Sequence, residues 1–168
     1  SFQIKQVWDL YLNGRKKRDF DYLCQNLILR KLHNNIKTIY KVQQADRNNI
    51  VRQMKILLSE NVEMWVVRLD VRHFYESINR EKLITKLEED ARFTCPSLTL
   101  LQALFKDPVV ASGTGLPRGL CVSAAMSELY MKYFDLNIRR VEGVYYYARF
   151  VDDIIVFCSS EQSKDLVW

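Results

Sequence analysis

YYYARFVDDIIVFC, residues 145–158, is the stretch that decides the fold. Two runs rich in aromatic and β-branched residues flank the adjacent carboxylates Asp152 and Asp153. Runs of this composition are typical of β-strands. The stretch therefore predicts a tight hairpin that bends at Val151 and Asp152 and carries an acidic tip.

The acidic tip has two interpretations. Asp is a common turn residue, so a solvated Asp-Asp turn is the simpler one. An unpaired carboxylate near apolar surface, however, costs roughly several kcal/mol or shifts its pKa, which favours a bound cation. Two hard oxygen ligands suit Mg²⁺ or Mn²⁺. From this stretch alone, both interpretations stay open.

The composition is that of an ordinary globular protein. The chain has 168 residues, 48% of them hydrophobic, which suits one domain or a large part of one. No apolar run approaches the roughly 20 residues of a membrane span, and the polar start SFQIKQ is not typical of a signal peptide. We therefore expect a cytoplasmic protein with no membrane partner. Four widely spaced cysteines are expected as small buried hydrophobic residues: Cys24, Cys95, Cys121 and Cys158.

Positive charge is concentrated in the first third of the chain. Residues 1–60 hold 12 of the 25 Lys and Arg and 5 of the 20 Asp and Glu, a balance of +7 that leaves −2 for the remainder. A solvated basic face is one interpretation. A basic region joined to an acidic one also suits nucleic acid or nucleotides as ligands.

A helix is predicted from about Asn48, with an apolar stripe that includes Ile50, Met54, Leu57 and Leu58. Its cations lie off this stripe, at Arg47, Arg52 and Lys55. They form either a solvated outer face or a surface for a triphosphate or a nucleic-acid backbone.

A second acidic position follows this helix. Residues 65–70, WVVRLD, alternate with the period of a strand, which places Asp70 near the strand's carboxyl end. Asn79 is expected to cap the next helix, whose apolar face includes Leu83 and Leu87.

A glycine-rich loop precedes the last long helix. Gly113, Gly115 and Gly119 fall within seven residues, beside Pro117 and Arg118. Such a loop at a helix amino end suits close backbone approach or an anion, although neither the Walker nor the dinucleotide fingerprint is matched. The helix after it is expected to pack through one stripe, formed by Val122, Met126, Leu129, Tyr133 and Leu136.

In this order and spacing, the three stretches resemble motifs A, B and C of reverse transcriptases. LDVRHFYESI (69–78) corresponds to motif A, GLPRGLCVSA (115–124) to motif B, and YARFVDDIIVF (147–157) to motif C. The resemblance spans about Arg47 to Phe157. The chain looks most like the abortive-infection and defence-associated reverse transcriptases of bacteria.

Three departures accompany this resemblance. Phe150-Val151 stands where the family usually has Tyr-Ala, Arg118 where it has Gln, and Ala124 where it has Pro. The metal-binding carboxylates are kept, whereas the changes in motif B put ordinary handling of the template in doubt.

The resemblance implies an α+β fold: a right-hand polymerase palm, made of an antiparallel sheet with helices on one face, plus mostly helical basic fingers. The thumb would lie beyond Trp168. The expected divisions are a basic region with part of the fingers (1–62), the palm with motif A (63–79), a helical insertion (80–114), and the palm with motifs B and C (115–168).

The resemblance also implies roles for individual residues. Asp70, Asp152 and Asp153 would be catalytic, and two Mg²⁺ or Mn²⁺ ions would be held by Asp70, the backbone of Val71 and Asp152. Nucleotide binding would involve Phe74, Tyr75, Arg47, Arg52, Lys55, Arg118 and Gly119, with the ring of Tyr75 excluding a 2′-hydroxyl. Template and primer would contact Gly115, Pro117, Ser123, Phe150 and Val151.

The implied function is RNA-directed DNA polymerisation in bacterial antiphage defence. The partners would be dNTPs, an RNA template and a DNA or RNA primer, and a non-coding RNA or a companion defence protein stays open. One alternative is template-independent or protein-primed DNA synthesis on the same fold. Another is an inactive scaffold that binds nucleic acid, although crowded carboxylates without a cation repel each other.

Overall fold

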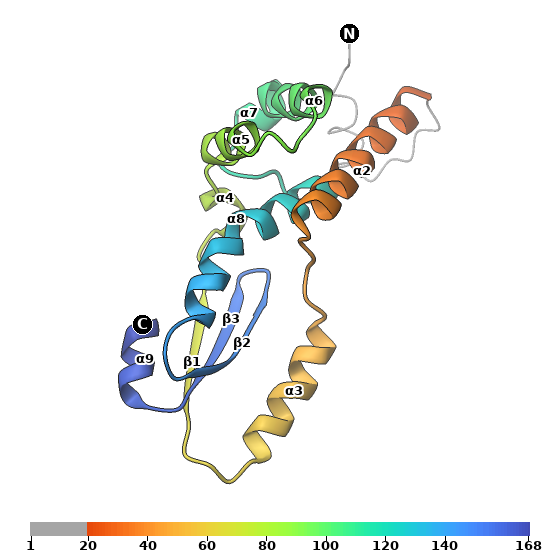
Figure 1. The fold of residues 1–168 in the computed structure, drawn as a ribbon. Coiled ribbons are helices and arrows are strands. Elements are labelled where there is room, and N and C mark those ends of the chain that lie inside the picture. Colours follow the sequence, from red (N-terminus) through yellow and green to blue (C-terminus); the bar gives the residue numbers. More distant parts are fainter. Residues whose placement is uncertain (1–19) are drawn as a thin grey trace. The chain divides into compact units, whose positions relative to one another are not determined.

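The structure, a computed structural model, describes residues 20–168 and divides them into two compact units. One unit combines the described residues up to Val42 with Tyr75–Tyr130, and we call it the helical unit. The other combines Gln43–Phe74 with Met131–Trp168, and we call it the sheet unit. Figure 1 labels the elements of both. Each unit is built from two separate chain segments.

The helical unit packs its helices around a core of aliphatic side chains. Its elements are α2 (Phe20–Tyr40), most of α4 (Phe74–Ser77), α5 (Arg80–Glu89), α6 (Cys95–Lys106), α7 (Pro108–Ala111) and the first half of α8 (Cys121–Arg139). The side chain of Asn79 accepts a hydrogen bond of 2.9 Å from the Lys82 amide, so the predicted cap of α5 is confirmed. Core residues at most 2% exposed include Leu32, Ile36, Leu83, Leu87, Leu101, Leu116, Met126 and Leu129.

The sheet unit contains the predicted strands. β1 (Trp65–Asp70), β2 (Val144–Phe150) and β3 (Asp153–Cys158) form an antiparallel sheet in the order β1-β3-β2. Phe150 pairs with Asp153, so the β2–β3 turn consists of two residues, Val151 and Asp152. The hairpin prediction is confirmed, and the mixture of helices with a small antiparallel sheet agrees with the α+β class.

Helices of the sheet unit contact both faces of this sheet. On one face, Asp135 of α8 bonds Tyr147, and Lys164 of α9 (Glu161–Val167) lies 4.6 Å from the centre of the Trp65 ring. On the other face, Gln53 of α3 (Arg47–Ser59) accepts a hydrogen bond from Tyr146. Because α3 falls in the region assigned to the fingers (1–62), its contact does not contradict the expected palm with helices on one face. Both faces of β3 carry apolar side chains, and helices that pack on each face shield them from solvent.

The predicted stripe of α8 is only half correct. Val122, Met126 and Leu129 are buried, whereas Tyr133 is 64% and Leu136 37% exposed. The helix passes from the helical unit to the sheet unit after Tyr130. In the sheet unit it uses a different side, with Met131 buried and Asp135 bonded to β2. A stripe drawn along one helix therefore fails where the packing partner changes.

Two further burial predictions need correction. Only Cys158 is buried, while Cys24 and Cys121 are half-buried and Cys95 is exposed. In α3, which forms where predicted, no residue is fully buried, and Leu58 is 57% exposed. Ile50, Met54 and Leu57 are half-buried. In the sheet unit α3 lies on one face of a sheet of only three strands, which is too small to bury a full helix face.

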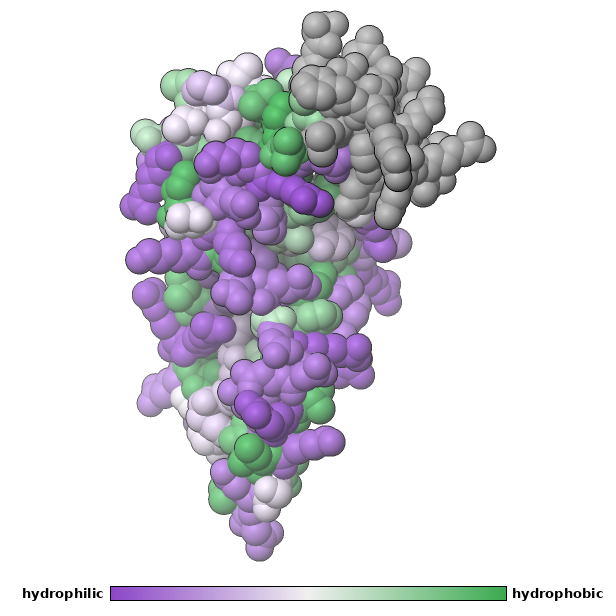
Figure 2. Space-filling model, turned by 90° about the vertical axis from the view of Figure 1, so that its right-hand side faces the viewer, coloured by the Kyte–Doolittle hydropathy of each residue, from purple (hydrophilic) through white to green (hydrophobic). Residues whose placement is uncertain are grey.

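Figure 2 shows hydrophilic side chains over most of the face that it displays, with apolar side chains scattered among them. Across residues 20–168, no helix has the length and apolar character needed to cross a membrane.

Candidate active site

Two of the predicted carboxylates lie directly opposite each other in the sheet unit. Asp70 ends β1 and Asp153 begins β3, and the two residues are partners in the antiparallel ladder. Cross-strand partners carry their side chains on the same face of a sheet, with Cβ atoms about 5 Å apart. Both side chains are exposed. The strands thus bring together two aspartates that are 83 positions apart in the chain.

Asp152 is presented by the turn beside this pair. The backbone amide of Val71 donates a hydrogen bond of 3.3 Å to the carbonyl of Asp152, which extends the β1–β3 ladder by one step. Asp152 and Val71 are both half-buried. Three aspartates and the backbone of Val71 therefore lie at the same end of the sheet.

The three carboxylates differ in their protein partners. Asp153 forms an ion pair of 3.1 Å with Arg68, which lies two residues before Asp70 on the same face of β1. Both side chains of this pair are at least half exposed, so the pair contributes about 0–1 kcal/mol. Within the described part of the chain, no ion pair engages the side chains of Asp70 and Asp152.

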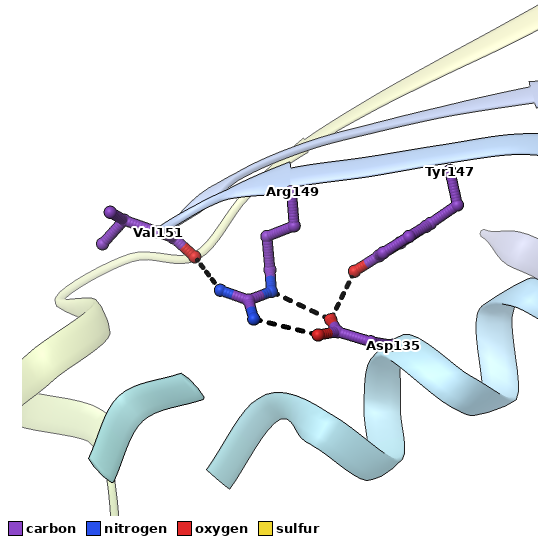
Figure 3. Close-up of polar contacts among 4 residues, drawn as sticks. All are labelled: Asp135, Tyr147, Arg149 and Val151. Carbon is purple, nitrogen blue, oxygen red and sulfur yellow. Dashed lines mark hydrogen bonds and ion pairs between the residues drawn. The ribbon is translucent and has the colours of Figure 1, made fainter. Parts of the chain in front are cut away.

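The turn has an unusual backbone. Val151 adopts φ 58, in the left-handed region. Two-residue hairpin turns require positive φ, but a β-branched residue is strongly disfavoured there. Arg149 donates from Nη1 to the Val151 carbonyl at 3.0 Å, as Figure 3 shows. Its Nε and Nη2 bond the two oxygens of Asp135, both at 2.9 Å.

Tyr147 completes this buried group. Its hydroxyl donates to Asp135 at 2.6 Å. Burial, followed by the neighbouring Asp135 carboxylate, raises the pKa of Tyr147 above its ordinary value. The hydroxyl therefore stays protonated and remains a donor.

A pocket of about 260 Å³ lies beside the carboxylates in the sheet unit. Arg47 of α3, Arg68 and Asp153 line it together with apolar side chains and Phe150. Arg52 and Lys55 lie on the same helix and are exposed, and Arg52 bonds Asn49 at 2.9 Å. Of the three predicted cations, the structure thus brings Arg47 next to the acidic site.

The motif B loop lies in the helical unit, together with Tyr75. The Leu116 amide donates to the Tyr75 carbonyl at 2.7 Å, and Arg80 binds the carbonyls of Gly113 and Gly115. Gly115 has φ +59, and a Cβ there would collide with the backbone of Tyr75 and Glu76. Glycine is therefore required at this contact between the loop and α4.

Arg118 is held by a neighbour in the same unit. Its Nε and Nη2 contact the two carboxylate oxygens of Glu76 at 2.6 and 3.1 Å. Bidentate pairs of this kind are the geometrically specific ones. Gly119 has φ 82, whereas Pro117 and Ser123 are buried, and Ser123 Oγ has no hydrogen-bond partner in the part of the chain that is described. Phe74, at the start of α4, is also buried.

The donors at the sheet end fit a divalent cation. Across residues 20–168, no cluster of three or more His, Cys, Asp or Glu side chains forms a ready-made metal cage. Mg²⁺ in polymerase-type sites is bound by one or two carboxylates, with waters and substrate phosphates as the other ligands. Asp70 and Asp152, with the carbonyl of Val71, are a hard-oxygen set of that kind.

A comparison with protein families decides the assignment. Residues 16–167 match the family described as reverse transcriptase (RNA-dependent DNA polymerase). The chain belongs to this family. The match covers the acidic sheet end and the glycine-rich loop, and a search of curated proteins found no match. Reverse transcriptases are nucleotidyl polymerases that act on nucleic acid with nucleotides as substrates, and their domains generally use divalent metals.

Sequence reasoning missed several residues of this reverse transcriptase that contact the site. Arg68 and Arg149 are not among the predicted site residues. Period-2 spacing places Arg68 on the same face as Asp70, and this signal could have found it. Asp135 carried no such signal, because its contact with Arg149 depends on how α8 packs on the sheet.

Proposed function

We propose that this reverse transcriptase is an RNA-directed DNA polymerase with Asp70, Asp152 and Asp153 as its catalytic carboxylates. The observation that carries this proposal is the register that pairs Asp70 with Asp153, beside the turn that presents Asp152. In the reaction, the 3′-hydroxyl oxygen of the primer bonds to the α-phosphorus of a dNTP. The bond from that phosphorus to the β-phosphate oxygen breaks, pyrophosphate leaves, and the hydroxyl proton passes to solvent.

Asp70, Asp152 and the Val71 carbonyl would hold two divalent ions, Mg²⁺ or Mn²⁺. When bound, such ions lower the pKa of the attacking hydroxyl and neutralise charge on the leaving group. Asp153 would assist beside them, at the primer terminus. Phosphoryl transfer depends mainly on positioning and charge neutralisation, so carboxylates can serve without a protein nucleophile.

The incoming nucleotide would use cations of α3. Arg47 lines the pocket next to Asp153, and Arg52 and Lys55 are exposed on the same helix, where they are available to a triphosphate. Tyr75, next to Phe74, would exclude the 2′-hydroxyl of ribonucleotides by sterics. Selection for deoxynucleotides would follow.

Template and primer would contact the motif B loop and the β2–β3 turn. Arg118 in the same loop, which Glu76 holds through two contacts, is proposed to bind the incoming nucleotide. The proposal includes the palm (63–79 and 115–168), the helical insertion (80–114), the basic fingers region (1–62) and a role in bacterial antiphage defence. The residues proposed for the template and primer are Gly115, Pro117, Ser123, Phe150 and Val151, and Gly119 is proposed for the nucleotide.

The test is nucleotide incorporation by the full-length protein. Labelled dNTPs are supplied with Mg²⁺ or Mn²⁺, with and without an RNA template-primer, and the product is sequenced. Asp152→Asn should abolish incorporation and leave the melting temperature within a few degrees. Asp165→Asn makes the same chemical change at an exposed position of α9 and should leave activity unchanged. Full activity of the Asp152→Asn variant would contradict the proposal.

The same assay separates the alternatives. A product complementary to the RNA supports the proposal. A product unrelated to any template identifies template-independent or protein-primed synthesis. Binding of nucleic acid without any product would identify an inactive scaffold.

A further inference from the structure

The buried group around Arg149 connects the interior of the sheet unit to the acidic turn. Arg149 is 7% exposed, and its guanidinium donates hydrogen bonds in two directions. Two of them bind both oxygens of Asp135 on α8, and the third binds the Val151 carbonyl in the turn (Figure 3). The hydroxyl of Tyr147 donates a further hydrogen bond to the same Asp135 carboxylate.

This arrangement is poorly explained as a stabilising ion pair alone. Replacing a buried ion pair with apolar residues is often neutral or stabilising, so such a pair is weak evidence for a role in stability. Asp135 alone would satisfy the charge of Arg149. The third contact is directed at a turn carbonyl and does not neutralise any charge.

That carbonyl belongs to the residue with the least favourable backbone in the hairpin. Val151 has φ 58, a region that its branched side chain disfavours. Without a partner, the turn would relax toward conformations that a valine prefers. Such a relaxation would rotate the peptide plane that leads into Asp152.

Two hydrogen bonds hold the turn, one at each of its residues. Arg149 binds the Val151 carbonyl at 3.0 Å, and the Val71 amide binds the Asp152 carbonyl at 3.3 Å. The second bond is long, so the first is the stronger constraint. Because Asp135 holds the guanidinium on two atoms, Arg149 cannot follow the turn if it moves.

We propose that Arg149 is a positioning residue which, anchored by Asp135 and Tyr147, holds Val151 in its left-handed conformation and so sets the direction of the Asp152 carboxylate. The inference rests on the proposed function, in which Asp152 binds a divalent ion. Groups that orient metal ligands typically change metal affinity 10–100-fold when they are removed.

Arg149→Lys in the full-length protein is the first test variant. It keeps the charge beside Asp135 but loses the planar fork, so it cannot hold both Asp135 oxygens and the turn carbonyl together. The dissociation constant for Mn²⁺, measured by electron paramagnetic resonance, should rise roughly tenfold. Amide hydrogen exchange should accelerate at residues 151–153 and stay unchanged at Val156 in the centre of β3.

A suppressor makes the test specific to the turn. Asn tolerates left-handed backbone better than Val. Val151→Asn added to Arg149→Lys should therefore return both Mn²⁺ affinity and turn exchange toward wild type. If Arg149 only stabilised the fold, adding Val151→Asn would restore neither the Mn²⁺ affinity nor the amide exchange of the turn.

Arg139→Gln is the charge control. Arg139 lies over the Tyr147 ring at 5.2 Å, and within residues 20–168 it makes no hydrogen bond or ion pair with the turn, so its removal should change neither readout. If Arg149→Lys does not fold, Asp135→Asn combined with Arg149→Gln takes its place, because that pair leaves no buried charge alone.

Unchanged amide exchange at residues 151–153 in Arg149→Lys, or in the double variant that replaces it, would overturn the inference, as would faster exchange spread evenly over the sheet. Absence of rescue by Val151→Asn would also overturn it. If the wild-type protein binds no Mn²⁺, the proposed function fails. The exchange and rescue measurements still decide the role of Arg149 in that case.

Discussion

Gly115→Ala should destabilise the helical unit by about 2 kcal/mol, the sum of two separate effects. The residue has φ +59, and an L-residue in that conformation costs about 1 kcal/mol. The new Cβ would also collide with the Tyr75 carbonyl and lie 2.5 Å from the Glu76 backbone carbons. Backbone cannot yield as a side chain can, so the loop must move. The 2.7 Å bond from Leu116 to Tyr75 would then be lost, at about 1 kcal/mol.

The measurement is urea unfolding of the full-length protein, followed by a probe of helix content. Gly113→Ala is the matched control, because a Cβ there would meet the Val110 carbonyl at 3.8 Å, an ordinary contact, and its φ lies outside the left-handed region. That control should be neutral or stabilising by up to about 1 kcal/mol. Equal stability of the two variants would refute the close approach of the loop to α4.

Two other predictions concern tyrosines. Tyr75→Ala should relax discrimination against ribonucleotides, measured as the ratio of kcat/KM for a dNTP and the matching rNTP, and an unchanged ratio would place the steric gate elsewhere. The free energy of unfolding should fall as the pH rises above 10.0, the ordinary pKa of Tyr147. Above this pH the unfolded chain releases the proton of the Tyr147 hydroxyl, whereas in the folded protein burial and Asp135 keep that proton bound. Tyr147→Phe should flatten this decline in alkaline urea titrations, and an equal slope in both proteins would contradict the raised pKa of Tyr147.

The local elements were largely predictable from the sequence. The alternation in residues 65–70, the β-rich runs around Asp152 and the cap at Asn79 depend on neighbours within a few positions, and all three are confirmed. Membership in the reverse transcriptase family was also visible in three short motifs, because each combines unusual residue types in a fixed order.

Burial was less predictable, because it depends on the surface that an element meets. The stripe of α8 is correct up to Leu129 and wrong at Tyr133 and Leu136, where the helix enters the sheet unit. Cys95 was expected inside and is exposed. Periodicity identifies which side chains share a helix face but carries no information on where that face loses its partner.

For the candidate site, the sequence by itself determined the acidic turn, because strand-forming runs lie directly on both sides of it, and it predicted the three carboxylates. Only the tertiary structure decided that Asp70 faces Asp153 and that Arg149 joins Asp135 to the Val151 carbonyl. These contacts join residues from different elements, and their geometry depends on strand register and helix packing. Local patterns depend on residues that are neighbours in the sequence, whereas strand register and helix packing depend on how the whole sheet unit buries its apolar side chains.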